Sequence, residues 1–434
     1  MIMDIKKVPA PTNAVPAAMR EYMDKILAKT NSEDMKKLFN NTFVNTWTTT
    51  IQISENDAFV ITGDIPAMWL RDSSAQVKNY LPIMNDSEEI KSVISKVVAR
   101  QMHSVLMDPY ANAFNFEGNG HGHTDDITDM DPWVWERKYE IDSLCYVIRL
   151  AYQYYTITKD ASMFTEEFKK AMELIIKTWR TEQKHENSPY RFTRYDCPYC
   201  DTLHNDGKGN PVAYTGMTWS GFRPSDDACT YGYLVPANMF AVVTLKEMAE
   251  MVKAGFGDEA LANEALALSA EIDEGIKKYA IIDTEDFGKV YAYEVDGRGN
   301  VIFMDDANVP SLISAPYLGY CSIDDEIYQN TRKMLLSKAN PFYFEGTQAK
   351  GIGSPHTPEN YIWHIALSMQ GLTTNDLAEK KMLLDFIMST HADQWYMHEG
   401  FNVDNANEFT RVWFAWANTI CSEFFIDCIE KGVI

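Results

Sequence analysis

The chain has few of the features that mark membrane proteins or nucleic-acid-binding proteins. Its 434 residues contain no run of about 18 apolar residues, so no transmembrane helix is expected. Basic residues are in deficit, because 39 Lys and Arg face 62 Asp and Glu and leave a net charge of −23. That charge disfavours nucleic acid or an anionic membrane as a partner, and it is easier to reconcile with a neutral or cationic ligand.

Cysteine is scarce, and the usual signs of export are missing. The seven cysteines are an odd number spread over a long chain, which is typical of reduced thiols. Residues 1–7 and the Pro- and Ala-rich stretch after them lack the apolar run of a secretory signal. The sequence therefore predicts a cytoplasmic protein.

Linkers, charge blocks and low-complexity runs are also absent, which favours a single domain over residues 1–434. Apolar residues recur mainly with helical spacing, and two stretches, 141–156 and 411–429, are apolar around most of the circumference, as in buried helices. The other predicted helices are 15–29, 33–49, 73–82, 89–107, 165–186, 235–253, 258–281, 311–319, 324–338, 358–371 and 374–391.

Strand signals are short, and two polar inserts are long. Residues 58–62 read as one strand, and 288–295 with 300–304 read as a hairpin. The inserts 109–139 and 187–229 are rich in Gly, His, Asp, Trp and Pro, and loops of that length in a compact domain are usually functional. The simplest fold is all-α, built from paired helices with the polar loops at one end.

The segment 62–73 combines a turn with Asp64, Trp69, Arg71 and Asp72. An indole face can stack on the C–H bonds of a sugar, and a guanidinium with a carboxylate can hold a vicinal diol in one orientation. A buried helix start with an Arg–Asp ion pair explains the same residues. This segment alone does not decide between the two.

Two further loops carry acidic side chains. Asp226 and Asp227 follow Ser225 ahead of an apolar stretch, where they fit a helix N-terminus with Ser225 as the cap. In a functional interpretation one of them would instead be a proton donor, which needs a raised pKa that a helix N-terminus opposes. Glu399 lies beside Gly400 among aromatic residues. It is either a base that holds a water molecule or a surface acid in a turn between helices.

His356, in the flexible loop 351–358, is suited to meet a hydroxyl, although many helix entries look similar. Glu140 and Asp142 lie at the start of the apolar helix 141–156, where they either line the same cavity or cap the helix.

Three metal-like motifs are discounted. Asp125, Asp126 and Asp129 match the DDxxD pattern of all-α terpene synthases, but they fall in a loop rather than on one helix face. Cys197 and Cys200 have zinc or redox spacing without a second pair, and His204 supplies only a third ligand. His121 and His123 with Asp125 fit a ligand-contacting or surface loop better than a metal site.

The motifs 64–73, 222–227 and 398–401, in this order and spacing, resemble glycoside hydrolase family 125 over nearly the whole chain. That resemblance implies an (α/α)6 toroid with long loops at one face and a small β-hairpin insert. It also implies an inverting exo-α-1,6-mannosidase that uses no metal or other cofactor and acts on α-mannoside oligosaccharides.

Carried over by position, the resemblance implies Asp226 as the general acid and Glu399 as the general base. Asp64, Arg71 and Asp72 would bind the terminal mannose, and Trp69 would shape its pocket. Glu140, Arg223 and His356 are further candidates for the same cavity.

An inverting enzyme needs a protonated acid and an ionised base. We therefore expect Asp226 to be more desolvated than Glu399 and to accept fewer hydrogen bonds. The alternatives are a toroidal glycosidase acting on glucosides or uronides, a magnesium-dependent terpene synthase using the DDxxD motif, and a non-catalytic sugar-binding or scaffold protein.

Overall fold

The computed structural model describes residues 8–434. Residues 1–7, on which part of the export prediction rests, lie outside this range, as does the very start of the predicted domain. Within residues 8–434 no helix is long and apolar enough to cross a membrane.

Six consecutive pairs of helices form the frame of residues 8–434, and in each pair an outer helix is followed along the chain by an inner one. The pairs are α2 (Glu33–Thr49) with α3 (Leu70–Gln76), α4 (Glu88–Met107) with α5 (Ile141–Thr158), α6 (Glu166–Glu182) with α8 (Val235–Phe256), α9 (Glu259–Tyr279) with α10 (Ala315–Leu318), α11 (Glu326–Leu335) with α12 (His364–Leu372), and α13 (Leu377–Ser389) with α14 (Ala415–Glu430). Shorter or separate helices are α1 (Ala17–Leu27), α7 (His204–Gly207), η1 (Lys78–Asp86), η2 (Ala161–Met163), η3 (His185–Asn187) and η4 (Tyr199–Asp201).

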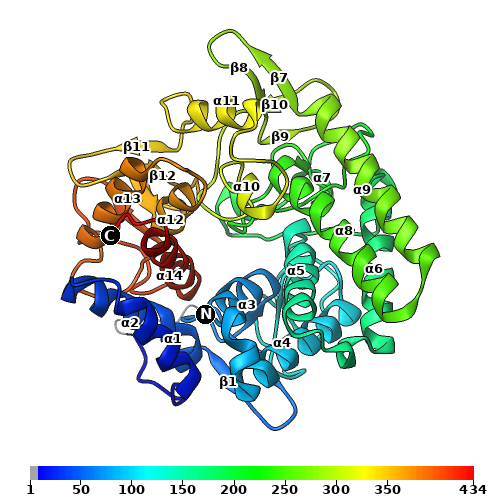
Figure 1. The fold of residues 1–434 in the computed structure, drawn as a ribbon. Helices are drawn as coiled ribbons and strands as arrows, with labels where there is room; N and C mark the ends of the chain where they lie inside the picture. The colour runs from blue at the N-terminus through cyan, green and yellow to red at the C-terminus, as the bar shows by residue number, and fades with distance from the viewer. Residues whose placement is uncertain (1–7) are drawn as a thin grey trace.

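The inner helices form a ring. Helix α3 packs against α5, α5 against α8 and α8 against α10, while α12 packs against α14, which in turn contacts α3. In Figure 1 the chain passes once around the ring, so that the last helix, α14, lies beside α2 and α3. The predicted (α/α)6 toroid of paired helices is confirmed.

Apolar pattern separates inner helices from outer ones. Helix α8 is buried along most of its length because other elements cover it on all sides, and its residues are correspondingly apolar. The outer helix α6 instead buries one stripe, which includes Phe168, Met172 and Trp179, and exposes Glu173 and Lys177. The same contrast holds between α5 and α4.

The helix starts differ in the same way. Every outer helix of the ring begins after a Ser, Thr or Asp whose side chain accepts a backbone N–H of the first turn: Ser32, Ser87, Thr165, Asp258, Asp325 and Asp376. None of the six inner helices has such a side-chain cap. Other connections take up the first N–H groups instead: Leu70 donates to the Asn112 carbonyl, Ile141 to Ser220 Oγ and Val235 to the Tyr293 carbonyl. The positive end of each helix dipole points toward one face of the ring.

The strands are short: β1 (Ile51–Ile53), β2 (Ala58–Val60), β3 (Met68–Trp69), β4 (Ala113–Phe114), β5 (Val134–Glu136), β6 (Tyr233–Leu234), β7 (Ile281–Thr284), β8 (Gly288–Tyr291), β9 (Glu294–Val295), β10 (Val301–Ile302), β11 (Tyr343–Glu345), β12 (Lys350–Ile352), β13 (Tyr361–Trp363) and β14 (Gly400–Asn402). Three of the small antiparallel sheets join neighbouring loops: β3–β4–β5 before α3 and α5, β6–β9–β10 before α8 and α10, and β13–β14 before α12 and α14. They fix the loops that begin the inner helices.

The predicted hairpin is only partly correct. Strand β9 pairs with β10 as expected, but β8 pairs with β7, whose first residue, Ile281, was expected to be the last of helix 258–281. The predicted strand 288–295 is interrupted after Tyr291, so its two halves pair with different partners.

Several inner helices begin at other residues than the apolar spacing predicts. The predicted helix 73–82 starts earlier, at Leu70, and after Gln76 the chain continues as the 3-10 helix η1, which contains Pro82. Helices α12 and α14 start later than predicted, at His364 and Ala415, because strand β13 precedes the first and an irregular segment the second.

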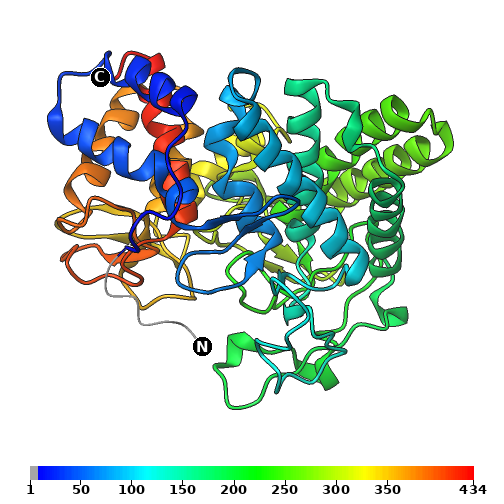
Figure 2. The same cartoon turned by 90° about the horizontal axis from the view of Figure 1, so that it is seen from below.

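Every outer-to-inner connection is long, and the connections back to the next outer helix are shorter. The long segments are 50–69, 108–140, 183–234, 280–314, 336–363 and 390–414. Figure 2 shows the ring from the side, with the helices in the upper part of the view and strands and loops below them. The polar loops are thus gathered at one face, as predicted.

The contact between α12 and α14 tests this packing. A Cβ atom on Gly371 of α12 would overlap the ring of Phe424 on α14. We predict that Gly371→Ala lowers the free energy of unfolding by about 1–3 kcal/mol through overpacking, as measured by urea denaturation. Phe424→Leu should cost less in the Gly371→Ala background than in the wild type, because it relieves the overlap. If the losses of unfolding free energy caused by Gly371→Ala and Phe424→Leu were strictly additive in the double variant, this packing would be contradicted.

Candidate active site

A cavity of about 320 Å³ lies at the loop face of the ring. All six outer-to-inner connections contribute to its wall, so the fold gathers residues that are distant in sequence. Aromatic faces come from Trp69, Trp135, Trp363 and Trp416. In chain order, polar lining residues include Asp64, Arg71, Asp72, His123, Lys138, Asp226, Asn308, His356, Glu399 and Arg411.

Seven of the nine residues predicted for the site line this cavity: Asp64, Trp69, Arg71, Asp72, Asp226, His356 and Glu399. Their position follows from the fold, because Trp69 immediately precedes α3 and the two charged residues after it occupy its uncapped first turn. The other two predicted residues, Glu140 and Arg223, do not line it.

Asp226 and Glu399 come from opposite sides of the ring. Asp226 lies in the connection that leads to α8, and Glu399 lies in the one that leads to α14. Along the inner helices α3, α5, α8, α10, α12 and α14 these connections are three places apart, which is half of the circuit. Two carboxyl groups separated widely in sequence therefore border one cavity from facing sides.

Arg71 is the centre of the acidic cluster on the Asp226 side. Its Nη1 lies 2.5 Å from Glu140 Oε2 and 3.2 Å from Asp142 Oδ2, and its Nη2 lies 3.4 Å from Asp226 Oδ1. Its Nε lies 3.5 Å from Asp72 Oδ2. The Arg71 side chain is only 3% exposed, so one buried guanidinium contacts four carboxyl groups.

The proton affinities within this cluster differ. Burial raises the pKa of Asp72 to about 6 and that of Asp142 to about 6, although the charge of Arg71 opposes both shifts. Burial also raises the pKa of Glu140 well above its usual range. Burial raises that of Asp226 as well, but the charges of Arg71 and Lys138 outweigh it and leave the pKa of Asp226 lowered.

Asp226 occupies a tight turn rather than a helix start. The turn is bounded by a bridge between Phe222 and Ala228, and α8 begins only at Val235. Asp226 has a left-handed backbone with φ of 68°, an uncommon conformation for a residue other than glycine. Lys138 Nζ fixes it by donating to the Asp226 carbonyl at 2.7 Å. The alternative of Ser225 as a helix cap is wrong.

The neighbouring carboxyl, Asp227, is placed differently. It is 2% exposed, lies outside the cavity lining, and its Oδ1 is 3.0 Å from Nδ1 of His356. Burial lowers the pKa of His356, but the bond to Asp227 and the charges of Asp227 and Glu399 raise it to about 9. Of the two adjacent aspartates, only Asp226 borders the cavity.

On the other side of the cavity, Glu399 is tied to Arg411. Arg411 Nη1 lies 3.4 Å from Glu399 Oε1, and its Nε donates to Asp64 Oδ2 at 2.9 Å. The Arg411 guanidinium also lies over the ring of Phe414, 4.4 Å from its centroid. Glu399 is 8% exposed and His398 is fully buried, so this segment is not the surface turn that the sequence left open.

Comparison with known proteins decides the family. A model of the family described as metal-independent alpha-mannosidase (GH125) matches residues 32–426. The chain belongs to this family. The resemblance stated from the three motifs is confirmed.

Two relatives of this GH125 protein match over nearly their whole length. The meiotically up-regulated gene 157 protein of Schizosaccharomyces pombe is 39% identical over 438 residues, which cover 95% of this chain and 86% of that protein. A metal-independent alpha mannosidase from Streptococcus pneumoniae, solved as a non-productive complex with alpha-1,6-mannobiose, is 48% identical with a TM-score of 0.94, over 96% of this chain and 99% of that one.

A bacterial glucoamylase solved with acarbose has a TM-score of 0.59 at 12% identity, over 95% of this chain and 58% of that one. At that identity the likeness concerns the fold alone, and it places GH125 among the toroidal folds.

Two predictions about the GH125 site are wrong. Arg223 lies behind the cavity wall, where its Nε donates to Glu294 Oε1 at 2.6 Å, and the other oxygen of Glu294 accepts the backbone N–H groups of Thr230 and Tyr231. It thus holds the loop that carries Asp226. Glu140 is 1% exposed and lies beneath Arg71.

The expected difference in desolvation between the two carboxyls is also wrong. The side chain of Asp226 is 28% exposed and that of Glu399 is 10% exposed. Asp226 Oδ1 accepts from both Arg71 and Asn112, whereas Glu399 has one contact, to Arg411. Burial raises the pKa of Asp226, but the neighbouring charges together outweigh it.

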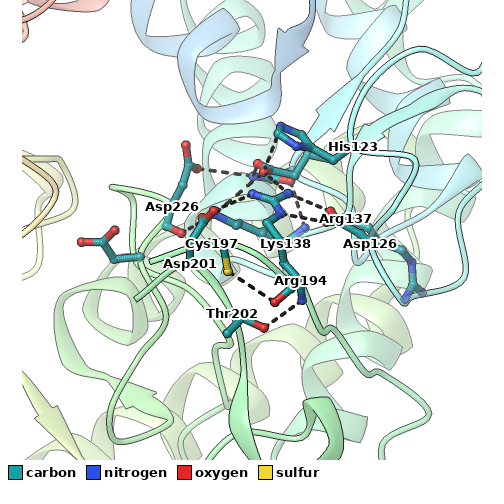
Figure 3. Close-up of polar contacts among 12 residues, drawn as sticks. His123, Asp126, Arg137, Lys138, Arg194, Cys197, Asp201, Thr202 and Asp226 are labelled. Carbon is teal, nitrogen blue, oxygen red and sulfur yellow. Dashed lines mark hydrogen bonds and ion pairs between the residues drawn. The ribbon is translucent and has the colours of Figure 1, made fainter. Parts of the chain in front are cut away.

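Of the residues in the three metal-like motifs, only His123 lines the cavity. Asp125 and Asp129 are exposed in a loop, and Asp126 is held through both of its oxygens by Arg194, at 2.7 Å each. Figure 3 shows Arg194 and Lys138 among Asp126, Asp201 and Asp226. Within residues 8–434 no group of three or more His, Cys, Asp or Glu is arranged to hold a metal ion. Asp126 of the DDxxD motif thus fastens insert 109–139 to insert 187–229.

Sequence reasoning missed several cavity residues, above all Arg411, Lys138 and Asn308. Arg411 was absorbed into a predicted helix, although its place beside Trp413 and twelve residues after Glu399 was a usable signal. Lys138 lies in a run of charged residues between Trp135 and Glu140, and this run was a second usable signal.

The His356–Asp227 pair makes the stability depend on pH. Because the pKa of His356 rises from 6.5 to about 9 on folding, its contribution is complete below about pH 6.5 and is lost as the pH rises through about 9. We predict that His356→Gln melts at a lower temperature than the wild type at pH 6, and that the difference disappears by about pH 10. Calorimetric scans across this range measure it.

The matched background is Asp227→Asn, in which the effect of His356→Gln should depend much less on pH, because Asp227 supplies the largest of the interactions that raise the pKa of His356. A difference in melting temperature that persists unchanged in the Asp227→Asn background would contradict the pairing.

Proposed function

We propose that this protein removes the terminal, non-reducing α-1,6-linked mannose of oligosaccharides or glycans and inverts the anomeric configuration. Asp226 acts as the general acid and Glu399 as the general base. One observation carries the proposal: in this member of an α-mannosidase family, two carboxyl groups from opposite connections of the ring border a single cavity. The complex of the Streptococcus pneumoniae relative with alpha-1,6-mannobiose supports the linkage.

The chemistry requires the two groups to work on opposite faces of the sugar ring. The acid protonates the glycosidic oxygen as the C1–O bond breaks, and the base removes a proton from the water that attacks C1. Inverting enzymes hold these carboxyl groups roughly 6.5–9.5 Å apart to leave room for that water. The proposed base, Glu399, lies 3.4 Å from Arg411 Nη1, which holds it at the cavity wall.

The residues around the acid and the base suit a mannose ring. Arg71 and Asp72 present donors and acceptors to vicinal hydroxyls, and Trp69 offers an apolar face. Asp64, held by Arg411, presents a further acceptor, and His356 a charged donor below its pKa of about 9. Together they would bind one sugar in a fixed orientation.

Exo action fits the closed inner end of the cavity. Trp416 of α14 lines it and also borders a second cavity of about 30 Å³, further along the ring axis. Beyond it Lys78 Nζ lies 2.9 Å from Glu423 Oε2. A pocket with such a floor admits a chain end rather than the middle of a chain.

Replacement of the two acids tests the assignment. We predict that Asp226→Asn and Glu399→Gln each lower kcat on α-1,6-mannobiose by about 10²–10⁴-fold, the usual contribution of a general acid or base. Both variants keep the size of the side chain, so mannose binding should survive. Released mannose, measured in initial-rate assays, gives the result.

The adjacent Asp227→Asn is the matched control and should retain far more activity than Asp226→Asn. Wild-type enzyme with and without chelator, on α-1,6-, α-1,2- and α-1,3-mannobiose, tests the linkage in parallel. Activity of either acid variant within a few-fold of wild type would refute the assignment, and preference for another linkage would refute the substrate.

A further inference from the structure

The cluster around Arg71 holds more acid than one cation can balance. If Asp72, Glu140, Asp142 and Asp226 were all ionised, four negative charges would surround one positive charge. The side chains of Glu140 and Asp142 are fully buried. Because an uncompensated buried charge is costly, the cluster must retain protons at neutral pH.

Contacts indicate where one of these protons lies. Arg71 joins Glu140 to Asp226, because its Nη1 lies 2.5 Å from Glu140 Oε2 and its Nη2 lies 3.4 Å from Asp226 Oδ1. Glu140 Oε2 also accepts from Ser143 Oγ, whereas its Oε1 is buried and has no hydrogen-bond partner within residues 8–434. An ionised carboxylate only accepts hydrogen bonds, so a buried carboxyl oxygen that no donor reaches is the favoured place for a proton.

We propose that Glu140 is a positioning residue that shares the acid's proton with Asp226 and keeps it available at neutral pH. This inference rests on the proposed function, in which Asp226 is the general acid. Glu140 lies beneath the cavity floor and does not touch the substrate. It acts only through Asp226 and through Arg71, which it holds against the same aspartate.

The proton transfers balance over one turnover. The Glu140 O–H proton moves to the Asp226 carboxylate, and the Asp226 proton moves to the glycosidic oxygen, which leaves with the electron pair of the C1–O bond. The attacking water gives one proton to Glu399, which later releases it to solvent. The Glu140–Asp226 pair then takes one proton back, so the net reaction consumes one water.

Charged neighbours explain why Asp226 needs this partner. Arg71 faces it from α3, Lys138 from the segment after β5 and His356 from the connection before α12, and all three favour its ionised form. Negative charges near it are Glu136 on β5 and Asp72 on α3.

Glu140 itself is surrounded by Arg71, Asp142 and the buried thiol of Cys229. A negative charge on Glu140 disfavours ionisation of Asp226, so the pair loses its last proton only at a higher pH than Asp226 alone would.

Glu140→Gln tests the inference, because the amide keeps the size of the side chain and removes the titrating group. We predict that the basic limb of the kcat/KM profile on α-1,6-mannobiose moves down by about one pH unit or more. Activity at neutral pH then falls about tenfold or more. On 2,4-dinitrophenyl α-mannoside, whose leaving group needs little protonation, the variant should stay within a few-fold of wild type.

Asp142→Asn is the matched control, because it removes another buried carboxylate that contacts the same Nη1 atom of Arg71 as Glu140 does. It should move the basic limb of the profile less than Glu140→Gln does. Equal shifts for the two variants, or equal losses on both substrates, would overturn the role of Glu140. Asp226→Asn separates this failure from a failure of the proposed function: if it too lost equal activity on both substrates, Asp226 would not be the acid.

A second measurement does not depend on turnover. Difference infrared spectra between wild type and Glu140→Gln should show the C=O stretch of a protonated carboxyl in the wild type at pH 7. Absence of that band from the difference spectrum would overturn the inference.

Discussion

Arg71 projects from the first turn of α3 into four carboxyl groups, and its buried guanidinium is what allows these groups to lie together. It connects three segments, because Glu140 and Asp142 belong to the start of α5 and Asp226 to the loop before α8. A planar cation with five donors can serve several carboxylates, which lysine could not do in the same geometry. Lys138 adds a second cation on the carbonyl of Asp226. The position and the proton affinity of the proposed acid both follow from these contacts.

The ring provides the frame for those contacts. All six inner helices begin without a side-chain cap, and all six start at the face where the long connections meet. Small sheets tie the connections together in neighbouring pairs. At this face the positions before the inner helices are occupied by cavity residues such as Trp69 and Trp363 rather than by capping side chains. The positive ends of the helix dipoles point toward this face and suit a site that is rich in carboxylates.

The same asymmetry explains how far the fold and the site could be predicted from the sequence. Outer helices carry cap residues such as Ser32 and Asp258, and their predicted starts lie within three residues of the observed ones. Inner helices lack this signal, so α12 and α14 were predicted to begin too early. Within the site the motif residues Asp226 and Glu399 could be found, whereas Arg223, Glu140 and Arg411 were misjudged because their partners, Glu294, Arg71 and Asp64, are distant in sequence. Ion pairs between remote segments leave no local pattern.

The central claim is that two carboxyl groups face each other across one sugar, with a water molecule on the side of Glu399. Proton NMR of α-1,6-mannobiose during the first minutes of hydrolysis tests it most directly, before mutarotation mixes the anomers of mannose. The account predicts that β-mannose appears first and α-mannose grows in later. Initial release of α-mannose would contradict it, because retention requires a carboxylate close enough to form a covalent intermediate.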